Sequence, residues 1–130
     1  MKKIITTEKA PKAIGPYSQA VEINSTLFIS GQIPVNPATG EVVVDEIKEQ
    51  THQVLKNLGT ILSSAGYSYS DVVKTTCMLS DMANFAAMNE VYSKYFTKDF
   101  PARSTFQVVK LPLGVLIEIE AIAGKLNKPD

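Results

Sequence analysis

The sequence has very few of the residues from which common catalytic and metal sites are built. Among its 130 residues there are one cysteine, Cys77, and one histidine, His52, and there is no tryptophan. This excludes an internal disulfide, a zinc site of the usual Cys/His type and a pair of catalytic histidines. Cys77 lies in a strand-like run, where a buried thiol is expected. His52 lies opposite the apolar stripe of a predicted helix, so a solvated surface histidine is expected.

The chain also has no excess of charge of either sign. Its 13 basic and 13 acidic residues give a net charge of zero, so no long-range field favours nucleic acid or an acidic membrane. No stretch is long enough to span a bilayer, and residues 1–18 contain no continuous apolar segment of the signal-peptide kind. No glycine-rich phosphate loop follows a strand. We therefore expect a cytoplasmic protein with no nucleic-acid partner, no membrane contact, no nucleotide cofactor and no metal.

The order of the elements predicts one domain over residues 1–130, because the chain is too short for two domains of ordinary size. Apolar periodicity predicts two helices, one capped by Asp45 and ending at Gly66, the other capped by Asp81 and running to about Lys98. Strands are predicted over residues 2–6, 18–23, 26–33 and 71–79, with a turn at Asn24-Ser25. Short strands and two helices predict an α+β, two-layer fold in which both helices cover one face of the sheet. The other sheet face would then be uncovered, which favours self-association.

Arg103 is the only arginine, since the other twelve basic residues are lysines. A lone guanidinium suggests a position that needs a planar, permanently charged donor of two parallel hydrogen bonds. Arg103 precedes the strand-like run Ser104–Lys110, and a second run, Val115–Ala123, carries Glu118 and Glu120. The short loop between the two runs predicts a β-hairpin.

Pairing Lys110 with Val115 in this hairpin places Gln107 opposite Glu118 and Thr105 opposite Glu120. Alternation then predicts a core face and a second, mixed face. The core face would carry Ser104, Phe106, Val108, Ile117, Ile119 and Ala121, and the mixed face Arg103, Thr105, Gln107, Val109, Leu116, Glu118, Glu120 and Ile122. Such a mixed face is typical of an interface between copies of the chain that can also hold a polar site.

Several separated motifs, in order and covering nearly the whole chain, resemble the RidA family, also called YjgF/YER057c/UK114. They are residues 13–19 (AIGPYSQ), 30–34 (SGQIP), 72–76 (VVKTT), 101–104 (PARS), 111–112 (LP) and 117–123 (IEIEAIA). The resemblance implies a homotrimer of chorismate-mutase-like α+β subunits, each with a mixed, mostly antiparallel sheet and two helices on one face, and with sites between subunits. It also implies a cofactor-independent 2-iminobutanoate/2-iminopropanoate deaminase, which hydrolyses reactive 2-aminoacrylate or 2-iminobutyrate-type enamines and imines to 2-oxo acids and ammonia.

The resemblance also implies roles for particular residues. Arg103 would bind the substrate carboxylate and Glu118 would position or activate the water. Tyr17, Ser30, Gly31, Asn89 and the backbone around Thr105 would line the pocket of a small 2-imino or 2-oxo acid. Many members have cysteine where this chain has Thr105, so a thiol nucleophile is not available at that position.

Simpler interpretations stand beside these roles. Arg103 could form a structural ion pair with Glu120, Tyr17 could pack as a loop residue, Ser30-Gly31 could be a β-bulge, and Asn89 could be a surface amide. A trimer that only binds 2-oxo acids, or an endoribonuclease or translation inhibitor, are the alternative functions. In the predicted hairpin Arg103 and Glu118 would be separated by on the order of 13 Å within one chain. That separation favours a site shared by neighbouring subunits.

Overall fold

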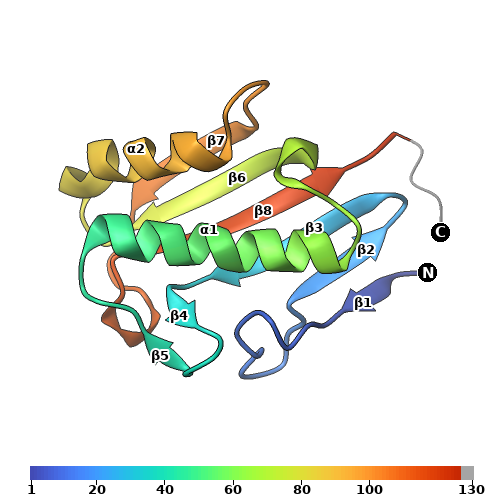
Figure 1. Ribbon diagram of the computed structural model, residues 1–130, viewed down its shortest axis with the longest axis horizontal. Coiled ribbons are helices and arrows are strands. Elements are labelled where there is room, and N and C mark those ends of the chain that lie inside the picture. The colour runs from blue at the N-terminus through green and yellow to red at the C-terminus, as the bar shows by residue number, and fades with distance from the viewer. Residues whose placement is uncertain (127–130) are drawn as a thin grey trace.

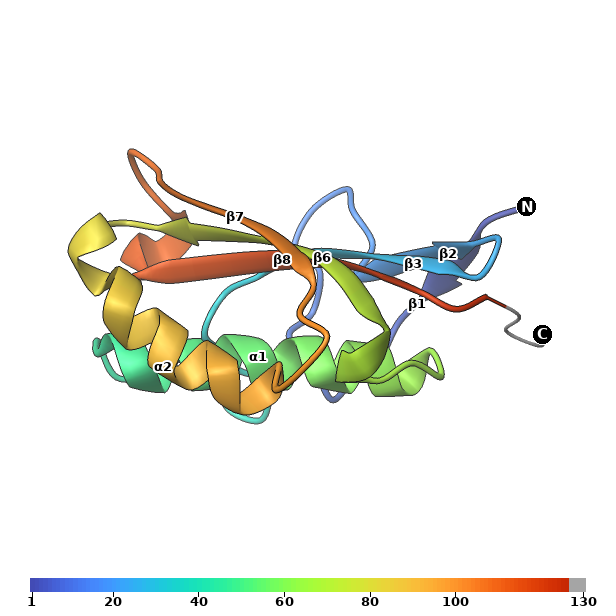
Figure 2. The same ribbon diagram turned by 90° about the horizontal axis from the view of Figure 1, so that it is seen from above.

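The computed structural model describes residues 1–126, in which two helices cover one face of a six-stranded sheet (Figures 1 and 2). The sheet has the order β1-β2-β3-β8-β6-β7, and every pair in it is antiparallel except β6 and β7. The strands are β1 (Lys3–Ile5), β2 (Ala20–Ile23), β3 (Thr26–Gln32), β6 (Val72–Leu79), β7 (Ala102–Gln107) and β8 (Ile117–Gly124). The helices are α1 (Ile47–Ser64) and α2 (Phe85–Tyr95), with short 3-10 helices at Tyr69–Asp71, Met82–Asn84 and Pro112–Gly114. The predicted two-layer α+β architecture is confirmed.

Helix α1 forms where the apolar periodicity predicts it, and its ends have identifiable causes. Its N-cap is Glu46 rather than the predicted Asp45, because the Glu46 carboxylate accepts a 2.8 Å hydrogen bond from the Glu49 N–H. The helix stops before Gly66, which adopts φ +83°, a conformation that glycine reaches without strain. The buried stripe of the helix packs on the sheet and comprises Val54, Leu55, Leu58, Ile61 and Leu62.

The alternation of β8 divides the molecule into a core side and an open side. Ile117, Ile119, Ala121 and Ala123 are buried against the helices, as predicted for the first three, whereas Glu118, Glu120 and Ile122 alternate with them. The open side of the sheet also carries two exposed aromatic residues, Phe28 opposite Ile122 and Phe106 opposite Met78. This side has no helix over it among the described residues (Figure 2).

The predicted hairpin between Arg103 and Ala123 is wrong. Strand β6 lies between β7 and β8, pairing in parallel with β7 and antiparallel with β8. The unit β6–α2–β7 is a strand–helix–strand crossover, the connection that parallel neighbours require. Consequently Thr105 lies opposite Cys77 rather than Glu120, and Gln107 lies opposite Leu79 rather than Glu118.

The predicted faces of β7 are therefore exchanged. Ser104 and Phe106, expected in the core, are exposed, while Arg103 and Thr105 are partly buried on the helix side. The ion pair of Arg103 with Glu120 is also wrong, because β6 separates the two strands and Glu120 points to the open side. The cause is strand β6, which lies between β7 and β8. Because β7 pairs with β6 and not with β8, the register of β7 against β6 decides which of its side chains share a face with those of β8.

Three local predictions had different outcomes. The turn at Asn24-Ser25 is confirmed, with φ of 48° and 58° at its two residues, as a two-residue hairpin turn requires. Helix α2 ends at Tyr95, earlier than the predicted Lys98, and Asp81 caps the 3-10 helix that precedes it. His52 is partly buried rather than solvated, because its Nδ1 lies 2.9 Å from the Tyr95 hydroxyl at the contact between α1 and α2.

Candidate active site

Arg103 extends from edge strand β7 toward helix α2, which fixes its guanidinium. One guanidinium N–H donates a 2.8 Å hydrogen bond to the Asn89 side-chain oxygen. The guanidinium carbon lies 4.9 Å from the centre of the Tyr92 ring and 5.5 Å from that of Phe85. No carboxylate of residues 1–126 forms a salt bridge with Arg103. The side chain is therefore held in place, while its charge is unmatched within the described part of the chain.

Thr105 lies two residues from Arg103 along the same face of β7. Its Oγ1 is buried and has no hydrogen-bond partner within residues 1–126. Across the strand pair lies Cys77, which is fully buried, as predicted for a structural thiol. Burial raises the pKa of the Cys77 thiol to about 11, so it is protonated at neutral pH. Cys77 is therefore not available as a nucleophile in place of a thiol at position 105.

Glu118 occupies the open side of β8, directly over Gly31. A Cβ placed on Gly31 would lie 2.0 Å from Glu118 Oε2, so only glycine leaves room for this carboxylate. The register shifts between Ile29 and Gln32, which confirms the irregularity expected at Ser30-Gly31. Burial, followed by the charge of Glu120, raises the pKa of Glu118 above its usual range. A carboxyl of this kind can pass protons to and from a bound water.

Tyr17 lies in the loop before β2, which projects from the open side of the sheet (Figure 2). The Ser30 hydroxyl donates a 2.6 Å hydrogen bond to the Ser18 carbonyl and so joins this loop to β3. The buried Gln19 side chain accepts a 2.7 Å bond from the Thr7 N–H and donates a 2.8 Å bond to the Pro11 carbonyl. The loop is therefore anchored at both ends, although the Tyr17 ring itself is half exposed.

Tyr17 and Gly31 line one pocket of about 470 Å³. The pocket lies between the N-terminal loop and the hairpin β4 (Val35–Asn36) and β5 (Glu41–Val42), and Gln19, Val35 and Leu113 contribute to its wall. Ser30, Asn89, Arg103 and Thr105 do not line it. Glu118 does not line it either, although it lies against Gly31. The structure thus places Gly31 beside both Glu118 and the pocket that Tyr17 lines, and separately brings Asn89 to Arg103, with Thr105 on the same face of β7.

These two groups of residues lie on opposite faces of the sheet. Arg103 lies opposite Thr75 on β6, and Thr75 lies opposite Ala121 on β8. Ala121 is three residues along β8 from Glu118. Two strand spacings and three residues of strand give roughly 14 Å between the Cα atoms of Arg103 and Glu118. A ligand of a few heavy atoms cannot contact both side chains within one chain.

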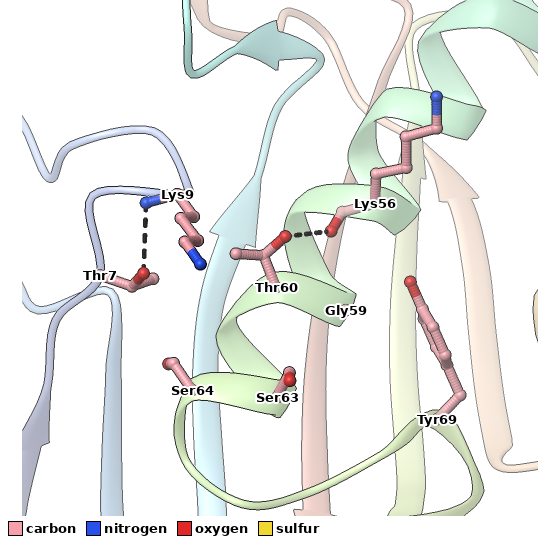
Figure 3. Close-up of a pocket in the computed structure, with 8 residues that line it drawn as sticks. All are labelled: Thr7, Lys9, Lys56, Gly59, Thr60, Ser63, Ser64 and Tyr69. Carbon is pink, nitrogen blue, oxygen red and sulfur yellow. Dashed lines mark hydrogen bonds between the residues drawn. The ribbon is translucent and has the colours of Figure 1, made fainter.

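A larger groove of about 630 Å³ lies on the helix side, between α1 and the N-terminal loop (Figure 3). It is lined by two cations, Lys9 and Lys56, and by hydroxyls that include Thr60 and Ser63. Figure 3 shows the Lys56 amine directed away from Lys9, so the two charges do not converge on one point. Within residues 1–126 no three His, Cys, Asp or Glu side chains gather where a metal ion could bind. The same residues contain no helix long and apolar enough to cross a membrane.

Sequence reasoning missed the residues that hold the candidate site. Phe85 and Tyr92 are not among the predicted site residues, yet both rings contact Arg103. Phe85 precedes Asn89 by four residues and Tyr92 follows it by three, a spacing that could have placed all three on one helix face. Gln19 belonged to a family motif, but its hydrogen bonds to the loop backbone have no signal in the sequence.

Comparison with known proteins gives consistent matches over the whole domain. Residues 7–125 match the family model described as Endoribonuclease L-PSP. The chain is 50% identical over 123 residues to the mouse protein named 2-iminobutanoate/2-iminopropanoate deaminase, covering 95% of this chain and 91% of the mouse protein. It is 54% identical over 122 residues to the chloroplastic Reactive Intermediate Deaminase A of Arabidopsis thaliana, covering 94% of this chain and 65% of that protein. Among solved structures, a protein of the conserved Rid family from Yersinia pestis has a TM-score of 0.94 and 49% identity, covering 96% of this chain and 100% of that one.

Proposed function

Because this chain belongs to the RidA family, matched under the description Endoribonuclease L-PSP, we propose that it is a hydrolytic deaminase of 2-imino acids and their enamine tautomers. Its products would be 2-oxo acids and ammonia, as the name 2-iminobutanoate/2-iminopropanoate deaminase of the mouse relative indicates. The resemblance in the sequence motifs is confirmed by these matches. The residue roles below are our proposal.

The observation that carries the proposal is the state of Arg103. Its guanidinium is fixed by Asn89 and two rings, yet it forms no salt bridge within residues 1–126. A partly buried cation without a counter-charge is costly unless a ligand supplies one. The carboxylate of a 2-imino acid fits, since a guanidinium binds a carboxylate through two parallel hydrogen bonds.

Glu118 would exchange protons with the water molecule that attacks the imine. In the reaction the oxygen of water bonds to C2 of the imine while a proton from the water passes through the Glu118 carboxylate to the imine nitrogen. In the resulting carbinolamine the hydroxyl proton passes through the same carboxylate to the amino nitrogen, and ammonia leaves as the C2–N bond breaks and the C2=O bond forms. A raised pKa suits this exchange, because the group must both accept and return a proton near neutral pH. No covalent intermediate is involved, so Thr105 in place of cysteine is compatible with the reaction.

The proposal includes a homotrimer with its sites between subunits. Arg103 and Glu118 point to opposite faces of the sheet, so one substrate would contact Arg103 of one copy and Glu118 of a neighbour. The uncovered sheet face supports this arrangement, since Phe28 and Phe106 are each 45% exposed on it. Tyr17, Ser30 and Gly31 would complete the pocket on the Glu118 side.

A coupled assay tests the proposed activity. An amino-acid dehydratase generates the imine, and release of the 2-oxo acid is timed with and without this protein. We expect Arg103→Ala to abolish the acceleration and Arg103→Lys to abolish most of it, because lysine cannot make the two parallel bonds. Lys98→Ala, which removes an exposed cation in the loop after α2, is the control. Light scattering checks that the Arg103→Ala variant keeps its oligomeric state. Full activity of that intact variant would remove the proposal.

The same assay separates the alternatives. A trimer that only binds 2-oxo acids would bind 2-oxobutyrate and leave the rate of imine decay unchanged. The description Endoribonuclease L-PSP raises RNA cleavage as the other alternative. The net charge of zero and the engagement of His52 with Tyr95 count against it. RNA cleavage that co-purifies with the oligomer and disappears in Arg103→Ala would favour it instead.

A further inference from the structure

We propose that Tyr92 is a positioning residue that aims the Arg103 guanidinium, by holding one face of it against an aromatic ring and leaving an edge free for a carboxylate. The inference rests on the proposed function for the identity of the ligand. The contacts that support it involve Tyr92 and Thr75, to which the proposed reaction gives no role.

The guanidinium is held by three side chains from successive turns of one helix face. Phe85, Asn89 and Tyr92 follow one another at spacings of four and three residues, which brings them to the same side of α2. The two rings lie 5.5 and 4.9 Å from the guanidinium carbon, and the Asn89 oxygen accepts one N–H. A cation over an aromatic face is attracted by the ring quadrupole, most strongly where water is excluded. The nearer ring, Tyr92, is the stronger of the two aromatic contacts.

Tyr92 is itself fixed. Its hydroxyl lies 2.7 Å from the Thr75 hydroxyl, which is fully buried on β6. Its ring also packs on Phe96, with 4.6 Å between ring centres. Thr75 is the residue on β6 that pairs with Arg103, so the same strand position anchors the ring and neighbours the arginine backbone. The guanidinium therefore rests on a ring that cannot swing away.

This support matters because Arg103 comes from an edge strand. Strand β7 has a neighbour on one side only, and a long arginine side chain there would otherwise sample many rotamers. Of its five N–H donors, one is bonded within residues 1–126. The contact with the Tyr92 ring is not a hydrogen bond of the guanidinium, so it can hold the guanidinium without consuming the donors that a carboxylate needs.

Three variants test this role. Tyr92→Leu removes the ring, and Tyr92→Phe keeps the ring but removes the hydroxyl bonded to Thr75. Tyr95→Leu is the matched control, because it removes a ring from the same helix whose contacts are with His52 and Tyr69. The readouts are the dissociation constant of 2-oxobutyrate by calorimetry, kcat and KM in the coupled assay, and the side-chain Nε–Hε signal of arginine by NMR. Since Arg103 is the only arginine, that signal needs no assignment by mutation.

For Tyr92→Leu we expect 2-oxobutyrate binding to weaken about 3- to 30-fold, from the usual strength of a cation–ring contact. KM should rise by a similar factor while kcat changes less, because the contact orients the group that binds the carboxylate throughout the reaction. Tyr92→Phe should recover most of the affinity, and Tyr95→Leu should match the wild type. The Nε–Hε signal should be displaced by the ring in wild type and in Tyr92→Phe, and move to the position of a free arginine in Tyr92→Leu.

Wild-type affinity in Tyr92→Leu, or equal weakening in Tyr95→Leu, would overturn the proposal. If Tyr92→Leu does not fold, the wild-type spectrum still decides, because an Nε–Hε signal at the free-arginine position would contradict a guanidinium held against a ring. A wild-type protein that neither binds 2-oxobutyrate nor accelerates imine hydrolysis would instead overturn the proposed function. The wild-type NMR signal would in that case still decide the geometry.

Discussion

Replacing Gly31 with alanine should disable Glu118 while leaving the fold intact. The added Cβ would lie 2.0 Å from Glu118 Oε2, whereas ordinary contacts begin at 3.4 Å, so the carboxylate must move by about 1.4 Å. Misplacing a catalytic group by about 1 Å can cost on the order of 100-fold in rate. We therefore expect kcat for imine hydrolysis to fall about 100-fold.

The loss of stability should be small by comparison. The obstructing atoms nearest the new Cβ belong to the far end of a flexible, partly exposed side chain, which can turn away at little cost. We expect the melting temperature of Gly31→Ala to stay within about 5 °C of the wild type, which corresponds to about 1 kcal/mol for a domain of this size. Calorimetry and the coupled assay together separate a displaced carboxylate from a damaged fold.

Two further variants make the interpretation specific. Gly124→Ala places a Cβ 3.8 Å from the Ser25 carbonyl oxygen, an ordinary contact, so this control should keep wild-type activity. The double variant Gly31→Ala/Glu118→Ala should be no slower than Glu118→Ala alone, because both changes act through one carboxylate. A kcat for Gly31→Ala within twofold of wild type would refute the reasoning.

Two more predictions concern titration and packing. Burial and the Glu120 charge raise the pKa of Glu118 in the folded chain, so this carboxyl lowers stability as the pH rises above its unfolded-state pKa, and the loss is complete above the folded-state pKa. Glu118→Gln should therefore raise the melting temperature at about pH 8 but not at about pH 3.5, where the carboxyl is protonated in both folded and unfolded chains; equal changes at both would contradict this. Glu120→Gln should move the acid limb of the kcat/KM profile to lower pH, and an unmoved limb would contradict the coupling. In Gly59→Ala the new Cβ would meet the Tyr69 hydroxyl, which is bonded to the Leu55 carbonyl, and we expect a loss of about 1–3 kcal/mol in urea unfolding; an unchanged midpoint would show that the ring relocates freely.

Most elements could be predicted because their signals are local. The stripe from Val54 to Leu62 indicates α1, and the alternation from Ile117 to Ala123 assigns each side chain of β8 to a face. The Ser30-Gly31 interruption is also a local signal, and the structure has a bulge there. Local signals do not say which strands are neighbours, and for that reason the hairpin of β7 and β8 was wrong.

The position of β7 in the sheet could have been predicted from the order of the elements. A predicted strand over residues 71–79, a helix and then a third segment form a strand–helix–strand order, which is typical of parallel neighbours. That rule would have placed β7 beside β6 and moved Arg103 to the helix side of the sheet. The partial burial of His52 had no such signal, because it depends on where Tyr95 meets α1.

The sequence by itself indicated most of the elements, the two-layer class, the family and the candidate residues, because each depends on side-chain chemistry at fixed spacing along the chain. It also determined that Arg103 is the only guanidinium. The tertiary structure decided which of these residues meet. Arg103 meets Asn89 and Tyr92 on the helix side of the sheet, and Glu118 meets Gly31 on the open side. The reason is that strand order and register are set by the packing of distant segments, and inserting β6 between β7 and β8 reverses the face on which Arg103 lies relative to Glu118.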